Sequence, residues 1–154
     1  MDHSTAARIV QIVALLGPCT SKTIAKYALR DVMSIQSLLR SLTKQGIITW
    51  EFQVGGGAFY YYHLPDKLPA LTKRRPAASM VAHIAKNPGD TLREYVTPID
   101  DLDYSVYTRW ATKLLKLRIF NREFVGKDGQ KRVYRYTLNP KLYAYNQAIH
   151  KNDV

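Results

Sequence analysis

The chain has 154 residues, a formal net charge of +11 and a pI of about 9.8. The excess is shared, because residues 1–76 carry ten Lys/Arg against four Asp/Glu and residues 77–154 carry thirteen against eight. This balance favours a polyanionic partner for both halves. Cys19 is the only cysteine, which excludes an internal disulfide and a zinc site built from several cysteines. Apolar runs are too short to span a bilayer and no signal peptide is evident, so we expect a cytoplasmic protein (nucleoid-associated if bacterial) with no membrane contact.

Helical periodicity and breaker residues divide the first half into three helices and a hairpin. Gly17-Pro18 should end the first helix, and Thr20 or Ser21 should cap the second. Asp31 or Ser34 should cap the third. The expected elements are helices over residues 5–16, 20–29 and 31–46, and strands over residues 47–54 and 59–64 around a triple-glycine turn.

Residues 66–76 are rich in proline and basic side chains and suit an extended linker. The same order of elements then returns. The expected elements are helices over residues 77–86, 91–96 and 104–117 and strands over residues 119–125 and 131–138. Asn139-Pro140 is typical of a helix start and predicts a C-terminal helix over about residues 141–150.

The strongest pattern in the chain is an internal repeat around the third helix. Residues 31–48 correspond to residues 103–120, an offset of 72 positions (103 minus 31). Each copy has an apolar side, a polar and basic outer face, and an apolar pair after the helix. Self-similarity at a fixed period indicates one structural unit used twice.

This order of elements, occurring twice, resembles a tandem winged helix-turn-helix protein. The most family-like segments are 42–48 (LTKQGII) and 114–120 (LLKLRIF), which look like the exit of a recognition helix into its strand. Arg118 stands where the first copy has Gly46, so we expect a distorted exit or a left-handed arginine. The resemblance implies a mostly α fold with small β-hairpins (α+β): winged-helix units at residues 1–65 and 77–138, a linker at 66–76 and a C-terminal helix within 139–154.

In such a fold the third helix of each unit enters a major groove and reads bases with the N-terminal half of its outer face. Glutamine pairs with adenine and arginine with guanine, which makes Arg109 the best single base-reading candidate. The candidates are Ser34, Gln36, Ser37 and Arg40 in the first unit, and Ser105, Thr108, Arg109, Thr112 and Lys113 in the second. The alternative interpretation is that both are merely solvated polar faces.

Phosphate contacts position a protein on DNA without specifying sequence. The candidates are Lys22, Lys26, Lys44, Lys73, Arg74, Arg75, Lys116, Lys127, Lys131, Arg132 and Arg135. The second hairpin is a basic wing, whereas the first has a glycine tip followed by aromatic residues. We expect Tyr60 and Tyr62 to pack in the core or at an interface, and Tyr107 and Trp110 to be core residues.

Catalytic chemistry is not indicated. The four histidines show no metal-ligand spacing, and no catalytic residue, metal or cofactor is expected. Asp100, Asp101 and Asp103 form the only dense acidic cluster, but a helix N-terminus explains acids there equally well. We expect them to point away from phosphates.

The sequence therefore predicts a non-enzymatic protein that binds double-stranded DNA in a sequence-specific manner. We expect a transcription regulator of the kind that a phage or plasmid encodes. No small-molecule effector is expected, since no effector domain is evident. A homodimer through Leu142, Tyr145 and Ile149 of the C-terminal helix is one possible assembly. Two alternatives stay open: a plasmid or phage replication initiator or partition protein, and a winged-helix protein-interaction module. The last should expose apolar residues on its third helix and wing.

Overall fold

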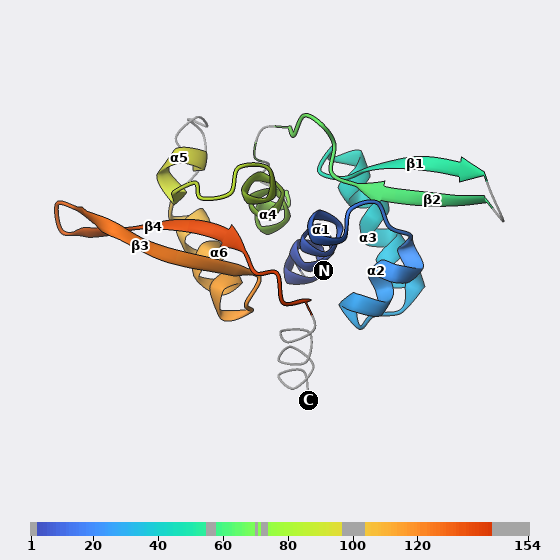
Figure 1. Cartoon of the computed structure of the whole chain (residues 1–154), viewed down its shortest axis with the longest axis horizontal. Helices are drawn as coiled ribbons and strands as arrows, with labels where there is room; N and C mark the ends of the chain where they lie inside the picture. Colours follow the sequence, from blue (N-terminus) through green and yellow to red (C-terminus); the bar gives the residue numbers. More distant parts are fainter. Residues whose placement is uncertain (1–2, 55–57, 70, 72–73, 97–103, 143–154) are drawn as a thin grey trace.

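The computed structural model describes residues 3–54, 58–69, 71, 74–96 and 104–142. Within them, three helices and an antiparallel hairpin occur twice (Figure 1). The first unit comprises α1 (His3–Leu16), α2 (Ser21–Ala28), α3 (Val32–Lys44), β1 (Thr49–Val54) and β2 (Ala58–His63). The second comprises α4 (Pro76–Lys86), α5 (Leu92–Val96), α6 (Tyr104–Lys116), β3 (Phe120–Asp128) and β4 (Lys131–Leu138). The α+β fold class with two winged-helix units is confirmed.

Local side-chain chemistry accounts for several of the helix starts. Thr20 caps α2, as expected. The Asp31 carboxylate accepts a hydrogen bond from the Ser34 amide at 2.8 Å and so begins α3. Thr91 and Glu94 form a reciprocal capping box at α5, in which the Glu94 carboxylate accepts from the Thr91 amide at 2.8 Å and the Thr91 hydroxyl accepts from the Glu94 amide at 3.3 Å. These starts are encoded within four residues of sequence.

The helix exits confirm the expected difference between the two copies. Gly46 follows α3 at φ 75°, and Arg118 follows α6 at φ 59°. Both residues lie in the left-handed region, where glycine is free of the Cβ penalty and arginine is not. The arginine exit keeps the same backbone path at a conformational cost.

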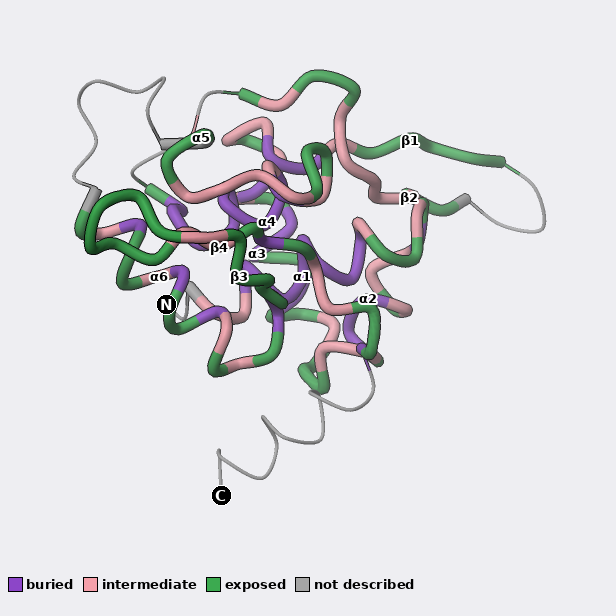
Figure 2. Tube along the Cα trace, turned by 60° about the vertical axis from the view of Figure 1, so that its left-hand side comes forward, coloured by how far each residue is buried: buried purple, intermediate pink, exposed green. Residues whose placement is uncertain are grey.

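The two units are joined through their first helices. α1 and α4 pack against each other in the centre of the molecule, and the two hairpins extend to opposite sides (Figure 1). Both central helices are buried over most of their length, whereas the hairpins are largely exposed (Figure 2). One continuous apolar core runs through both units. A unit of about 70 residues has little core of its own, so this shared burial supplements both.

Two polar side chains also bridge the units. Gln11 on α1 is fully buried, and its Nε2 donates to the carbonyl oxygens of Asn139 at 2.8 Å and Ile119 at 3.3 Å. Arg75 is 8% exposed, and its Nη2 donates to the Ser41 hydroxyl on α3 at 3.2 Å. The expected phosphate contact of Arg75 does not fit this buried position; the side chain connects the start of α4 to the first unit instead.

Each hairpin is held by a short segment that precedes the second helix of its unit. Cys19 pairs with Tyr62, and Thr91 pairs with Arg135, both antiparallel. The returning strand of each wing is thereby fixed against its own helices.

The C-terminal region is described only as far as Leu142. The Asn139 side chain accepts a hydrogen bond from the Lys141 amide at 3.0 Å, as expected of a helix cap. Leu142 is 7% exposed and belongs to the core of its own chain, which does not fit an exposed dimer contact. Tyr145 and Ile149 lie outside the described residues. No helix in the described part of the chain is long and apolar enough to cross a membrane.

Candidate nucleic-acid interface

The outer face of α6 is exposed along its whole described length. Helical spacing places Tyr107, Ala111 and Leu114 in the core. The opposite side carries the exposed residues Ser105, Thr108, Arg109, Thr112, Lys113 and Lys116. All five base-reading candidates of the second unit therefore share one accessible face.

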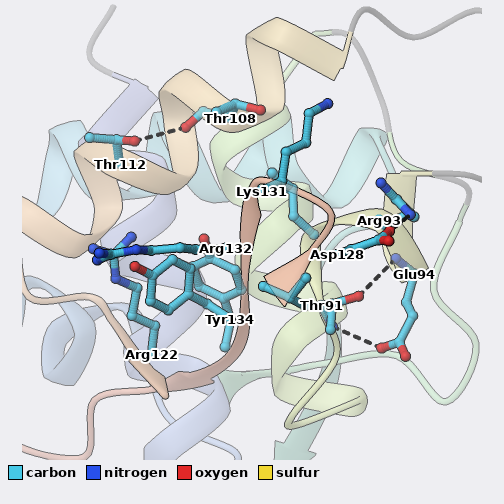
Figure 3. Close-up of a pocket in the computed structure, with 13 residues that line it drawn as sticks. Thr91, Arg93, Glu94, Thr108, Thr112, Arg122, Asp128, Lys131, Arg132 and Tyr134 are labelled. Atoms are coloured by element: carbon cyan, nitrogen blue, oxygen red, sulfur yellow. Dashed lines mark hydrogen bonds and ion pairs between the residues drawn. The ribbon is translucent and has the colours of Figure 1, made fainter. Parts of the chain in front are cut away.

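A groove of about 1000 Å³ lies between α6, α5 and the β3–β4 wing (Figure 3). Thr108 and Thr112 line it from α6. The wing contributes the cations Arg122, Lys131 and Arg132 and the ring of Tyr134. Hydroxyls on one wall and guanidinium or ammonium groups on the other are donors of the kind that bind phosphate oxygens.

Contacts between neighbouring side chains shape the walls of this groove. The Arg122 guanidinium lies 4.0 Å from the centre of the Tyr134 ring, a cation–π geometry that orients it. Arg93 on α5 pairs with Asp128 near the wing tip at 2.7 Å. Both side chains of that pair are 62% exposed, so the pair contributes little to the stability of the fold.

Arg122 was not among the residues selected from the sequence. It pairs with Tyr136 across the hairpin, and both line the groove. The alternation of side chains along the strands places Tyr134 and Tyr136 on one face of the hairpin, and the same alternation would have assigned Arg122 to that face.

Several predicted side chains also have partners within the protein. Lys113 lies 4.8 Å from the Trp110 ring, which is half-buried against the core and not fully inside it. The Thr112 hydroxyl donates to the Thr108 carbonyl at 3.0 Å. Arg135 is exposed and donates to the Gly89 carbonyl at 3.1 Å, so it anchors β4 to the segment before α5. Lys127 is exposed near the wing tip.

In the first unit, α3 presents the corresponding outer face. Gln36, Ser37, Arg40 and Lys44 are exposed there, and the phosphate candidates Lys22 and Lys26 are exposed on α2. The Ser34 hydroxyl donates to Asp31 at 2.9 Å and is therefore part of the helix cap. Met33 is 77% exposed on the same helix, but it was not among the base-reading candidates because those were all polar. An apolar side chain is of the kind that contacts the methyl group of thymine. Arg74 is exposed, and Lys73 lies outside the described residues.

The wing of the first unit has a different chemistry. Residues 49–63 contain no lysine or arginine. Trp50 is 45% exposed, and Phe52 and Tyr60 are each 49% exposed. The Tyr60 ring lies edge-on to Trp50 at 4.7 Å and tilted against Phe52 at 5.3 Å. The expectation that Tyr60 packs in the core or at an interface within the chain is wrong: its neighbours belong to the same exposed hairpin face.

Tyr62 behaves as expected and packs, half-buried, against the core. Burial raises the pKa of its hydroxyl, the neighbouring Tyr60 raises it further, and the positive charge of Arg40 opposes this. Arg40 on α3 therefore lies close to the aromatic side of the wing.

In the described residues, no three His, Cys, Asp or Glu side chains gather as a metal site. Asp100, Asp101 and Asp103 lie outside the described part of the chain.

The folded elements define a tandem winged-helix architecture. No protein-family model matches the chain, and no curated protein matches it. Among solved structures it is similar to a mutant of Lactococcus lactis ZitR, with 17% sequence identity, a TM-score of 0.40 and coverage of 73% of each chain. A superposition of this quality supports neither a shared ligand nor a shared mode of assembly.

Proposed function

We propose that this protein binds double-stranded DNA in a sequence-specific manner and acts as a transcription regulator. The observation that carries this is the groove of the second unit, in which a recognition-type helix and a cationic wing face each other across about 1000 Å³. A phosphate backbone held between Thr108 and the wing cations would bring the outer face of α6 to the base edges. The net charge of +11 gives the long-range attraction.

Within this proposal, base contacts and phosphate contacts are made by different residues. Arg109 reads a base, since it is exposed on the outer face of α6 and guanine is its preferred partner. Lys131 and Arg132 bind phosphate from the wing. Gln36 and Arg40 occupy the corresponding face of α3, so the two units would read different half-sites.

Selection of bound duplexes from a random library, followed by titration at several salt concentrations, tests the proposal. Arg109→Ala is expected to relax the preference at one base position, at a cost of about 1–3 kcal/mol on the selected site. Lys131→Ala should weaken all duplexes alike and reduce the salt slope by about one. Lys67→Ala, an exposed lysine outside the groove, is the matched control.

If no preferred sequence emerges at physiological salt, sequence-specific recognition is wrong. If Arg109→Ala and Lys131→Ala weaken all duplexes equally, the separate role of Arg109 is wrong. The replication-initiator alternative predicts a footprint over iterated origin repeats instead of a promoter. The protein-interaction alternative requires exposed apolar residues on helix and wing. Such residues occur on both wings and at Met33 on α3, but the second wing also carries the cations of the groove, and the outer face of α6 is polar.

A further inference from the structure

The β1–β2 wing has a face built from aromatic side chains, here called the aromatic face: Trp50, Phe52, Tyr60 and Tyr62. Antiparallel register pairs Trp50 with Tyr62 and Phe52 with Tyr60, which places all four on one side of the hairpin. The hairpin extends away from the body of the molecule (Figure 1), and three of the four rings are close to half exposed.

The repeat relates this face to the cationic groove of the second unit. Counting from the apolar pair that ends each recognition helix, Trp50 corresponds to Arg122, and their cross-strand partners Tyr62 and Tyr136 correspond as well. Arg122 and Tyr136 line the groove beside α6. The aromatic face therefore lies on the side of its hairpin that is next to α3, as the proximity of Arg40 to Tyr62 also indicates.

Three of the four positions are aromatic in both units, and the fourth is Trp50 in the first unit and Arg122 in the second. A phosphate strand fits the second groove, but the aromatic face offers no cation of its own to neutralise one. Aromatic rings instead bind nucleobases by stacking, which works for any base because every base has a π face. Bases inside a duplex are already stacked, so only unpaired bases present that surface.

We propose that the aromatic face of β1–β2 binds unpaired nucleobases of a DNA strand, with Trp50 and Tyr60 as the stacking rings. Arg40 is exposed on α3, and its positive charge acts on the Tyr62 hydroxyl, so it supplies positive charge for the backbone. Positive charge beside the rings favours a nucleic acid over an apolar protein segment as the occupant. The inference rests on the proposed DNA binding of the chain, but it concerns the other unit and another form of DNA.

Fluorescence gives a direct readout, because Trp50 and Trp110 are the only tryptophans. In a Trp110→Phe background, a single-stranded thymidine 12-mer is expected to quench Trp50 emission, and a blunt duplex of equal length is expected to leave it nearly unchanged. Affinities for a labelled 12-mer follow from anisotropy at fixed salt. Trp50→Ala and Tyr60→Ala should each weaken single-strand binding by about 5- to 150-fold, the range for loss of one stacked base.

Two comparisons sharpen the test. Phe59 is as exposed as Tyr60 but points to the opposite side of the same strand, so Phe59→Ala should leave single-strand affinity unchanged. Trp50→Leu keeps an apolar side chain without the extended ring and should lose nearly as much as Trp50→Ala. Single-strand binding that survives Trp50→Leu, or equal losses in Phe59→Ala and Tyr60→Ala, would overturn the proposal.

Other occupants have distinct signatures. Concentration-dependent protection of Trp50 without DNA would show that a second copy covers the face, and would overturn the proposal. Loss of duplex binding on Trp50→Ala, with no single-strand binding by the parent protein, would do the same. Failure of the proposed duplex recognition is separate, since it appears in the Arg109→Ala and Lys131→Ala titrations and leaves Trp50 quenching by the 12-mer unaffected.

Discussion

Truncation of one buried residue on α1 should destabilise both winged units together. Ile9 is fully buried in the core that runs through α1 and α4. Ile9→Ala removes three carbon groups, each worth about 0.8 kcal/mol of transfer free energy, and adds a cavity term. The expected loss of unfolding free energy is therefore about 3–4 kcal/mol. For a chain of this size each kcal/mol lowers the melting temperature by about 2–4 °C, so the fall should be roughly 6–16 °C.

The position of the two tryptophans makes the assay specific to each unit. Trp50 lies on the first wing and Trp110 on α6 of the second unit. Urea titrations of Trp50→Phe and Trp110→Phe proteins therefore follow the units separately, and their transitions should coincide before and after Ile9→Ala. Val54→Ala, at an 82% exposed position, should change stability by less than about 0.5 kcal/mol and is the control. A Trp110 transition that stays in place while the Trp50 transition moves would refute the shared core.

Three further predictions concern the helix exits, the cap of α3 and the buried thiol. Arg118→Gly should raise stability by roughly 1 kcal/mol and Gly46→Ala should lower it by a similar amount, because both residues lie at positive φ; chemical unfolding measures both. The Ser34 amide and hydroxyl lower the pKa of Asp31, so its stabilisation of α3 is present above about pH 4, the range of an unfolded aspartate, and is lost as pH falls through the lower folded pKa. The stability gap between the parent and Asp31→Ala should accordingly shrink from pH 7 to pH 2.5; a constant gap would exclude the ionised cap. Burial raises the pKa of the Cys19 thiol to about 11, so a thiol reagent at pH 8 should react only as fast as the protein unfolds; rapid reaction with the folded protein would contradict this.

Local sequence signals were sufficient for the order of elements, the helix caps and the left-handed arginine. The caps at Asp31 and Thr20 and the left-handed backbone of Arg118 depend on neighbouring residues in the sequence, so they could be predicted without the fold. The groove of the second unit followed in part, because strand alternation and helical spacing tell which side chains share a face.

Burial that depends on contacts between distant segments could not be predicted from local sequence. Arg75 belongs to a basic run that suits an exposed linker, yet packing of α4 against the first unit draws it to Ser41. Tyr60 belongs to an aromatic run that suits a core, yet it is 49% exposed and its ring contacts Trp50 and Phe52 of the same hairpin. Alternation assigns residues to a face but does not say whether another element covers that face, and this depends on tertiary packing.

The shared core also bears on how the two units divide their work. Since α1 and α4 are buried against each other and Gln11 bonds to the backbone of the other unit, α3 and α6 are held in one relative orientation. Two units joined by a flexible linker could bind DNA sites at variable spacing. Two units in a fixed orientation always contact the same two parts of a bound DNA, so the surfaces of the two units can differ in chemistry. Under the two proposals above, the groove beside α6 binds a charged duplex backbone and the aromatic face of β1–β2 binds bases that have left the stack.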